Sequence, residues 1–217
     1  MQIKICGITR PDQAVAIAQL GATALGFICV PTSPRYVTPG QIRNIAQALQ
    51  AHPQTAAVQR IGVFVDASAD QVCDTLAEAQ LTGAQLHGSE SPQTCRRLRQ
   101  LRPDIELIKA FRLRSPASLP GIEAYGDSVD ALLLDAFHPS AHGGTGKTLN
   151  WAALQNFRPQ QPWFLAGGLT PDNVTAALTQ LQPSGIDLSS GVEDAPGQKN
   201  LDLVRRLFST LRDFRKE

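Results

Sequence analysis

The sequence lacks the features that mark membrane proteins and nucleic-acid-binding proteins. Only 18% of its 217 residues are charged, the net charge is +1, and no long basic run is present, so neither nucleic acid nor an anionic membrane is an expected partner. No apolar run approaches the ~20 residues that span a bilayer, and the N-terminus shows no signal segment. These absences favour a cytoplasmic protein.

Cysteine is also scarce, and its spacing argues against two further classes of protein. The four cysteines, Cys6, Cys29, Cys73 and Cys95, are far apart and form no C-x-x-C pair. No Cys/His cluster has zinc-binding spacing, and the histidines offer no plausible ligand set. We therefore expect no disulfides, no metal site and no other cofactor.

What the sequence does contain is a regular alternation of strand-like and helix-like segments. Strand-like runs occupy residues 3–6, 24–28, 60–65, 84–86, 106–110, 131–134, 163–166 and 185–188. Apolar residues recur at helical spacing between them, least clearly in 115–124, which contains two prolines. Eight strand–helix units without a linker predict one domain, residues 1–217, folded as a (β/α)8 TIM barrel. The alternative, a flavodoxin-like or Rossmann sheet, usually has five or six strands and leaves some runs unexplained.

In such a barrel the carboxyl ends of the strands meet at one mouth, where catalytic residues lie. Cys6 ends the first run and precedes Gly7, which lets a ligand approach closely. Lys4, on the same face, is expected to favour the thiolate. Asp135 follows a run of leucines, where a carboxylate is costly unless it is paired or functional. The alternatives are a small buried side chain for Cys6 and a helix cap or structural ion pair for Asp135.

Two loops rich in glycine and serine follow the last two strands. They contain Gly167 and Gly168 after the seventh strand, and Ser189, Ser190 and Gly191 after the eighth. In β/α barrels these two loops commonly bind phosphate through backbone N–H groups. We therefore expect a phosphate site, the alternative being two ordinary tight turns.

Four further residues are candidate ligand contacts. Gly144 lies in the glycine-rich segment 143–147, which is predicted to fold over a ligand although its spacing is not that of a P-loop. Arg35, in a loop stiffened by prolines, suits a carboxylate or phosphate, the alternative being a solvated surface arginine. His87 either hydrogen-bonds to the ligand or caps its loop. Asp187 either orients a sugar hydroxyl or neutralises Lys4 inside the barrel.

Taken together, these segments closely resemble the phosphoribosylanthranilate isomerase family of tryptophan biosynthesis, over nearly the whole chain and in order. The matching segments are Lys4-Ile5-Cys6-Gly7-Ile8-Thr9, Gly26-Phe27, Ser33-Pro34-Arg35-Tyr36-Val37, Gly62-Val63-Phe64-Val65, Gln85-Leu86-His87-Gly88, Ile108-Lys109-Ala110-Phe111, Leu133-Leu134-Asp135, Gly143-Gly144-Thr145-Gly146-Lys147-Thr148, Ala166-Gly167-Gly168-Leu169, Pro171-Asp172-Asn173-Val174 and Asp187-Leu188-Ser189-Ser190-Gly191-Val192-Glu193. Cys29 and Asn150 depart from the usual residues, at positions that look like packing or capping.

The resemblance implies an Amadori rearrangement, in which N-(5-phosphoribosyl)anthranilate becomes 1-(2-carboxyphenylamino)-1-deoxyribulose 5-phosphate. It implies Cys6 as the base for the C2 proton and Asp135 as the acid for the ring oxygen. It also places Arg35 at the substrate carboxylate and the two glycine–serine loops at the phosphate. This chemistry needs Cys6 to be partly ionised near neutrality, although the pKa of a free thiol is ~8.5. It also needs Asp135 to be protonated. The sequence leaves both a monomer and a homodimer open.

Three rival functions are weaker. The histidine-pathway isomerase runs the same chemistry on an aminoimidazole, but its family pairs two aspartates and shows a half-barrel repeat, which is not found in this sequence. A phosphate-binding barrel without catalytic activity is disfavoured because Cys6 and Asp135 are both present. A metal-dependent epimerase lacks its ligands.

Overall fold

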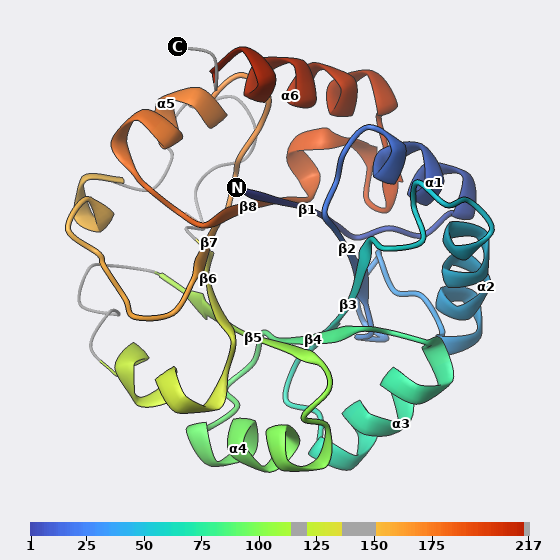
Figure 1. Ribbon diagram of the computed structural model, residues 1–217, viewed down its shortest axis with the longest axis vertical. Helices are drawn as coiled ribbons and strands as arrows, with labels where there is room; N and C mark the ends of the chain where they lie inside the picture. Colours follow the sequence, from blue (N-terminus) through green and yellow to red (C-terminus); the bar gives the residue numbers. More distant parts are fainter. Residues whose placement is uncertain (114–120, 136–150, 215–217) are drawn as a thin grey trace.

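The computed structural model describes residues 1–113, 121–135 and 151–214, which contain a closed barrel of eight parallel strands (Figure 1). The strands are β1 (Gln2–Cys6), β2 (Ala24–Ile28), β3 (Gln59–Phe64), β4 (Gly83–Leu86), β5 (Glu106–Arg112), β6 (Ala131–Asp135), β7 (Trp163–Ala166) and β8 (Gly185–Leu188). Each pairs with the next along the chain, and β8 pairs with β1, with Lys4 opposite Asp187. The predicted single-domain (β/α)8 barrel is confirmed, and the open-sheet alternative is excluded.

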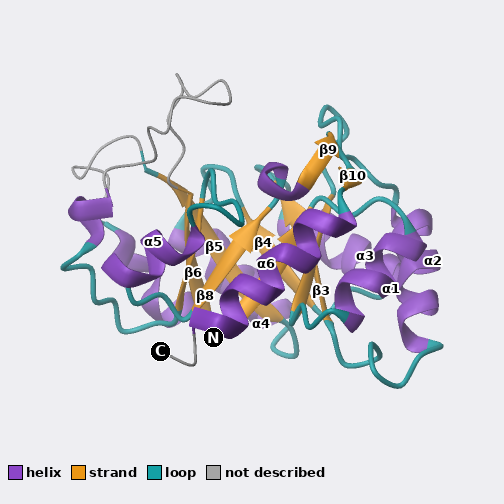
Figure 2. Cartoon of the chain, turned by 90° about the horizontal axis from the view of Figure 1, so that it is seen from above, coloured by secondary structure: helices purple, strands orange, loops and turns teal. Residues whose placement is uncertain are grey.

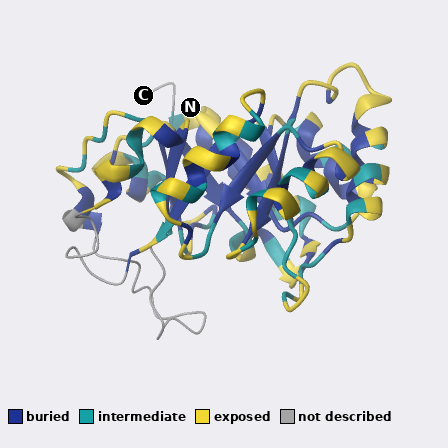
Figure 3. Cartoon of the chain, turned by 90° about the horizontal axis from the view of Figure 1, so that it is seen from below, coloured by how far each residue is buried: buried dark blue, intermediate teal, exposed yellow. Residues whose placement is uncertain are grey.

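An outer ring of helices covers the barrel (Figure 1). These are α1 (Pro11–Gln19), α2 (Pro39–Gln50), α3 (Ala69–Ala79), α4 (Pro92–Leu101), α5 (Val174–Gln180) and α6 (Leu201–Phe214). Their apolar stripes pack inward, as the helical spacing predicts; the four buried residues of α2 are Ile42, Ile45, Ala46 and Leu49. In Figure 3 the strands are buried, whereas the helices are exposed on their outer faces. No helix in the described ranges is long and apolar enough to cross a membrane.

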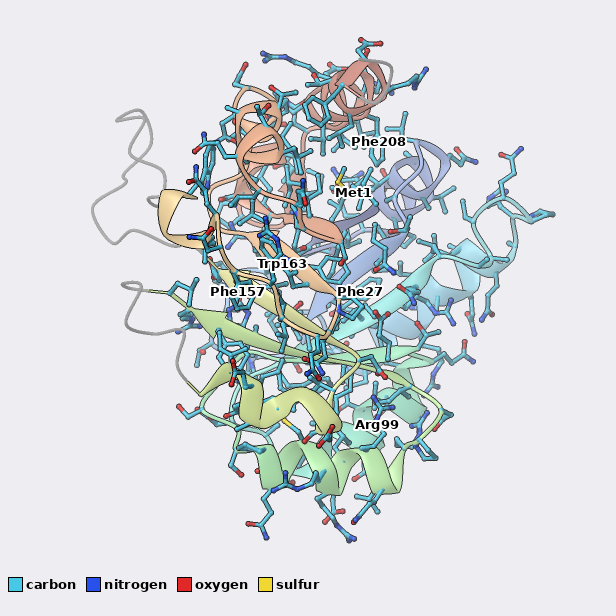
Figure 4. All side chains as sticks on the ribbon, turned by 60° about the vertical axis from the view of Figure 1, so that its left-hand side comes forward. Met1, Phe27, Arg99, Phe157, Trp163 and Phe208 are labelled. Atoms are coloured by element: carbon cyan, nitrogen blue, oxygen red, sulfur yellow. The ribbon has the colours of Figure 1, made fainter. Side chains whose placement is uncertain are left out.

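The two units after β5 and β6 differ from the other six. The described residues there contain only short 3-10 helices, η2 (Ile122–Ser128) and η3 (Trp151–Leu154). The expected helix at 115–124 falls largely on residues outside the described ranges, and its described part enters η2 after Gly121, whose φ is 97°. Phe157 and Trp163 pack edge to face on this side of the barrel, with ring centroids 5.5 Å apart (Figure 4).

The interior of the barrel is apolar in its middle and polar toward the mouth. A buried cluster of alternate strand residues fills the middle, among them Ile61, Ile108, Leu133 and Phe164. Beyond β8 the chain forms η4 (Ser190–Val192) and an antiparallel hairpin of β9 (Glu193–Ala195) and β10 (Gln198–Lys199). In Figure 2 this hairpin lies at the end of the barrel opposite the N-terminus, which is the mouth. Apolar side chains therefore fill the middle of the barrel, and polar side chains face its mouth.

Candidate active site

A cavity of about 250 Å³ opens at the carboxyl ends of the strands. The predicted site residues that line it are Cys6, Arg35, His87, Asp135, Gly167, Gly168, Asp187, Ser189, Ser190 and Gly191. Gly144 lies outside the described residues. The remaining predicted residues, which come from six different strand ends or the loops that follow them, thus meet at one opening.

Cys6 is the last residue of β1 and is buried beside Gly26 of β2. A Cβ atom at Gly26 would lie 2.6 Å from Cys6 Sγ and 3.0 Å from Lys4 Nζ, so only glycine leaves room for both side chains. Burial raises the pKa of the Cys6 thiol, and the charges of Lys4 and Lys199 oppose this without reversing it. Lys4 thus favours the thiolate as expected, but the expected net lowering of the Cys6 pKa is wrong, because desolvation of the thiolate outweighs the lysines.

Lys4 is fully buried inside the barrel and donates a hydrogen bond to Asp187 on the neighbouring strand, with Nζ 3.0 Å from Oδ1. Burial lowers the pKa of Lys4, but the negative charges of Asp187 and of ionised Cys6 outweigh it and leave the pKa raised. Asp187 therefore neutralises Lys4, one of its two expected roles. It also lines the cavity, so its second oxygen remains available to a sugar hydroxyl.

Asp135 ends β6 and lies beside His87, whose Nε2 is 3.4 Å from Asp135 Oδ2. The backbone N–H of His87 donates to Phe64 O, and its Nδ1 lies 3.0 Å from the amide nitrogen of Gln85. Gln85 is 1% exposed, and sequence reasoning did not single it out as a site residue. Within the described ranges, its Oε1 and His87 Nε2 have no hydrogen-bond partner. The contact with Gln85 orients His87, whose Nε2 stays near the Asp135 carboxyl.

The loops after β7 and β8 present bare backbone to the cavity. Gly167 and Gly168 have φ values of 88° and 67°, which favour glycine. A Cβ atom at Gly191 would lie 1.9 Å from Leu169 O, so the two loops touch only because this residue is glycine. The N–H groups of Gly167, Gly168 and Ser190 donate to no acceptor within the described ranges. Such free donors suit an anion.

Arg35 enters the cavity from the loop after β2 but is already paired. Its Nε and Nη2 donate to the carboxylate of Glu193, at 3.0 Å and 2.6 Å. Lys199 donates to the same carboxylate, with Nζ 2.7 Å from Oε1. Neither Glu193 nor Lys199 was predicted as a site residue. Glu193 lies in the segment 187–193 that carries the family resemblance, as Ser189 does, whereas nothing in the sequence distinguishes Lys199 from a surface lysine.

The charged groups of the site do not form a metal centre of the usual kind. Across the parts of the chain that the structure describes, no group of three or more His, Cys, Asp or Glu side chains is placed to hold a metal ion. What the cavity offers is a thiol, a carboxyl beside an imidazole, a guanidinium and free backbone donors. This set suits proton transfer on an anionic substrate.

Known proteins are similar to this chain in both sequence and overall fold. Residues 3–210 match the family described as N-(5'phosphoribosyl)anthranilate (PRA) isomerase. The N-(5'-phosphoribosyl)anthranilate isomerase of Rippkaea orientalis is 58% identical over 214 residues, covering 99% of this chain and 97% of that protein.

Solved structures agree with the sequence match. The crystal structure of phosphoribosyl anthranilate isomerase from Thermotoga maritima has a TM-score of 0.86 and 33% identity, covering 98% of this chain and 99% of that one. A crystal structure of phosphoribosyl anthranilate isomerase in complex with reduced 1-(o-carboxyphenylamino)-1-deoxyribulose 5-phosphate has a TM-score of 0.84 and 31% identity, with coverage of 98% and 99%. The chain belongs to the N-(5'-phosphoribosyl)anthranilate isomerase family.

Proposed function

We propose that this chain converts N-(5-phosphoribosyl)anthranilate to 1-(2-carboxyphenylamino)-1-deoxyribulose 5-phosphate in tryptophan biosynthesis, with Asp135 as acid and Cys6 as base. The observation that carries the proposal is the order of strands around the barrel, in which these two groups lie on either side of the proposed phosphate loops. β7 and β8 lie between β6 and β1, so the free N–H groups of their loops lie between the carboxyl and the thiol. A phosphate bound there leaves the sugar ring within reach of both.

Ring opening is the task of Asp135. Its proton goes to the ring oxygen, the bond from that oxygen to C1 breaks, and the anthranilate nitrogen lone pair forms a C1=N double bond. The product is an open-chain protonated Schiff base, and Asp135 becomes a carboxylate. His87, with Nε2 3.4 Å from that carboxylate, is placed to stabilise it and to return a proton from solvent.

Isomerisation is the task of Cys6. Its thiolate takes the C2 proton, the C–H electrons form C1=C2, and the C=N electrons return to nitrogen. The enolamine then becomes the ketone: C1 takes the proton held by Cys6, the O2 proton goes to solvent, and Cys6 is again a thiolate. Because burial raises the pKa of Cys6, the thiolate is favoured mainly once the cationic Schiff base forms beside it, with Lys4 and Lys199 adding to the field.

The substrate is bound by groups that do not transfer protons. Arg35 receives the anthranilate carboxylate, and the loops after β7 and β8 receive the phosphate. The family member solved with a reduced product analogue supports this class of small-molecule ligand. We further propose that residues 1–217 act as one domain, in the cytoplasm, as a monomer or homodimer, without nucleic-acid or membrane partners.

The experiment follows the loss of phosphoribosylanthranilate fluorescence with wild type, Cys6→Ala and Asp135→Asn. Because each proton transfer typically contributes ~10²–10⁴-fold, each variant is expected to lose at least about 100-fold in kcat with a much smaller change in KM. Cys73→Ala, on α3 away from the cavity, is the matched control and should keep full activity. Turnover of the histidine-pathway aminoimidazole substrate in place of the anthranilate one would overturn the assignment.

A further inference from the structure

Glu193, the first residue of β9, makes a denser set of contacts than a surface carboxylate does. Its side chain is 4% exposed. Arg35 donates to it from Nε, at 3.0 Å and 3.1 Å to the two oxygens, and from Nη2 at 2.6 Å. The backbone N–H of Gly197 donates to Oε1 at 3.1 Å. This fork-to-fork geometry fixes both the position and the plane of the guanidinium.

Lys199 fixes Glu193 in turn. Its side chain is fully buried, and Nζ donates to Glu193 Oε1, to Ser189 O at 3.3 Å and to the carbonyl oxygen of Cys6. The backbone of Lys199 is held by the side chain of Gln13 on α1, through one hydrogen bond in each direction. Glu193 is therefore tied to the carboxyl ends of β1 and β8, where the proposed base and phosphate site lie.

The stem of Arg35 is also fixed. A Cβ atom at Gly7 would lie 2.7 Å from Arg35 Cδ, so the arginine stem runs directly over the bare backbone that follows Cys6. Within the described ranges, Nη1 of Arg35 has no hydrogen-bond partner, although Arg35 lines the cavity. One edge of the guanidinium is thus used by Glu193, and the other is left for a ligand.

The charges at this corner sum to a value that suits one carboxylate. Arg35 and Lys199 supply two positive charges and Glu193 one negative charge, which leaves one unit of positive charge. Without Glu193 the two cations would repel each other, and the long arginine side chain would be free to leave the cavity for solvent.

We propose that Glu193 is a positioning residue for substrate recognition: it holds the Arg35 guanidinium over the Cys6 loop so that Nη1 meets the anthranilate carboxylate. The proposal rests on the proposed function, because it assigns that carboxylate to Arg35. It predicts that Glu193 matters only for substrates that carry the carboxylate. A purely structural role would affect every substrate alike.

The test compares two substrates, N-(5-phosphoribosyl)anthranilate and N-(5-phosphoribosyl)aniline, which lacks only the carboxylate. Glu193→Gln keeps the size of the side chain and removes its charge. With the anthranilate substrate it is expected to raise KM by about 10- to 100-fold, with a much smaller change in kcat, because the lost contact holds ground state and transition state alike. With the aniline substrate its KM should stay within about twofold of wild type.

Two further variants make the result specific. Arg35→Met should raise KM for the anthranilate substrate in the same way, and Glu193→Gln added to Arg35→Met should cause no further change, because Glu193 acts through Arg35. Glu78→Gln is the matched control, since it removes the charge from an exposed Arg43–Glu78 pair on α2 and α3, and it should change neither constant.

The outcomes separate this inference from the function on which it rests. If wild type does not discriminate between the two substrates, or if Arg35→Met discriminates as well as wild type does, the role of Arg35 in the proposed function fails. Two results would overturn the positioning role of Glu193. In the first, Arg35→Met loses the discrimination between substrates while Glu193→Gln keeps it. In the second, Glu193→Gln loses activity equally on both substrates. Should Glu193→Gln fold poorly, Glu193→Asp keeps the charge at a shorter reach and is expected to give the same substrate-dependent change in KM to a smaller degree.

Discussion

At the scale of single residues, the pKa of Cys6 is set by burial and by neighbouring charges acting in opposite directions. Its burial raises the pKa of the thiol, while Lys4 and Lys199 pull it down. Lys4 is itself kept charged by Asp187, 3.0 Å away. The reactivity of Cys6 is therefore set by its burial together with an ion pair inside the barrel, whose Asp187 also lines the cavity.

Lys4→Met is expected to raise the pKa of Cys6 further, because it removes a positive charge and leaves the carboxylate of Asp187 unpaired. A thiolate base works above its pKa, so the rising limb of activity with pH should move to higher pH. The measurement is the pH dependence of Cys6 alkylation, followed by peptide mass, together with the pH–kcat profile. Lys4→Met combined with Asp187→Asn keeps the pair neutral and should reverse part of the shift. An unchanged thiol pKa in Lys4→Met would remove Lys4 from the mechanism.

At the scale of elements, the loops after β7 and β8 act as one unit because Gly191 lets them touch. A Cβ atom there would lie 1.9 Å from Leu169 O. Gly191→Ala is expected to separate the loops and to raise both KM and the inhibition constant of inorganic phosphate by about 10- to 100-fold. Gly40→Ala in α2 is the control, since no atom lies within 4 Å of its added Cβ. Equal phosphate inhibition of Gly191→Ala and wild type would contradict a phosphate site in these loops.

The strands and most helices could be predicted because their patterns are local. Ile42, Ile45, Ala46 and Leu49 recur at helical spacing and are the buried face of α2. The 3-10 helix η2 was not predictable in the same way, because Gly121 and Gly126 weaken any helical pattern and tertiary contacts decide the outcome.

The residues of the site also fall into those that could be predicted from local patterns and those that could not. Cys6 and Asp135 could be predicted because each ends a strand, and the barrel rule brings strand ends together. The Arg35–Glu193 pair could not, because these residues are 158 positions apart and meet only through closure of the barrel and the β9–β10 hairpin. The pKa of Cys6 was mispredicted for a related reason, since burial cannot be read from Lys4 and Cys6 alone.

In the molecule as a whole, the buried ion pairs of the described residues lie toward the mouth. They are Lys4–Asp187, Lys109–Glu90 and Lys199–Glu193. Leu133, Phe164 and their neighbours fill the middle of the barrel with apolar side chains. Stability therefore comes mainly from the apolar layers, whereas the mouth contains buried ions that are stable only while both partners stay charged.

Acid should destabilise the fold through Glu193 in particular. Burial raises the pKa of this carboxyl, but hydrogen bonds from Arg35 and Lys199 outweigh it and leave the pKa lowered. A group with a lowered folded pKa contributes stability above its unfolded pKa, ~4.3 for Glu, and loses it as pH falls through the folded value. The exposed Arg10–Asp12 pair contributes little because solvent screens it.

Thermal unfolding of wild type and Glu193→Gln between pH 2 and 7 measures this contribution. The Tm of wild type should be constant near neutrality and should fall as the pH drops below about 4.3. The variant should start lower, by roughly 2–4 °C for each kcal/mol of lost pairing, and should depend less on pH. The two curves should converge as Glu193 protonates in wild type. A gap in Tm that stays constant down to pH 2 would mean that shape, and not the charge of Glu193, stabilises this corner of the barrel.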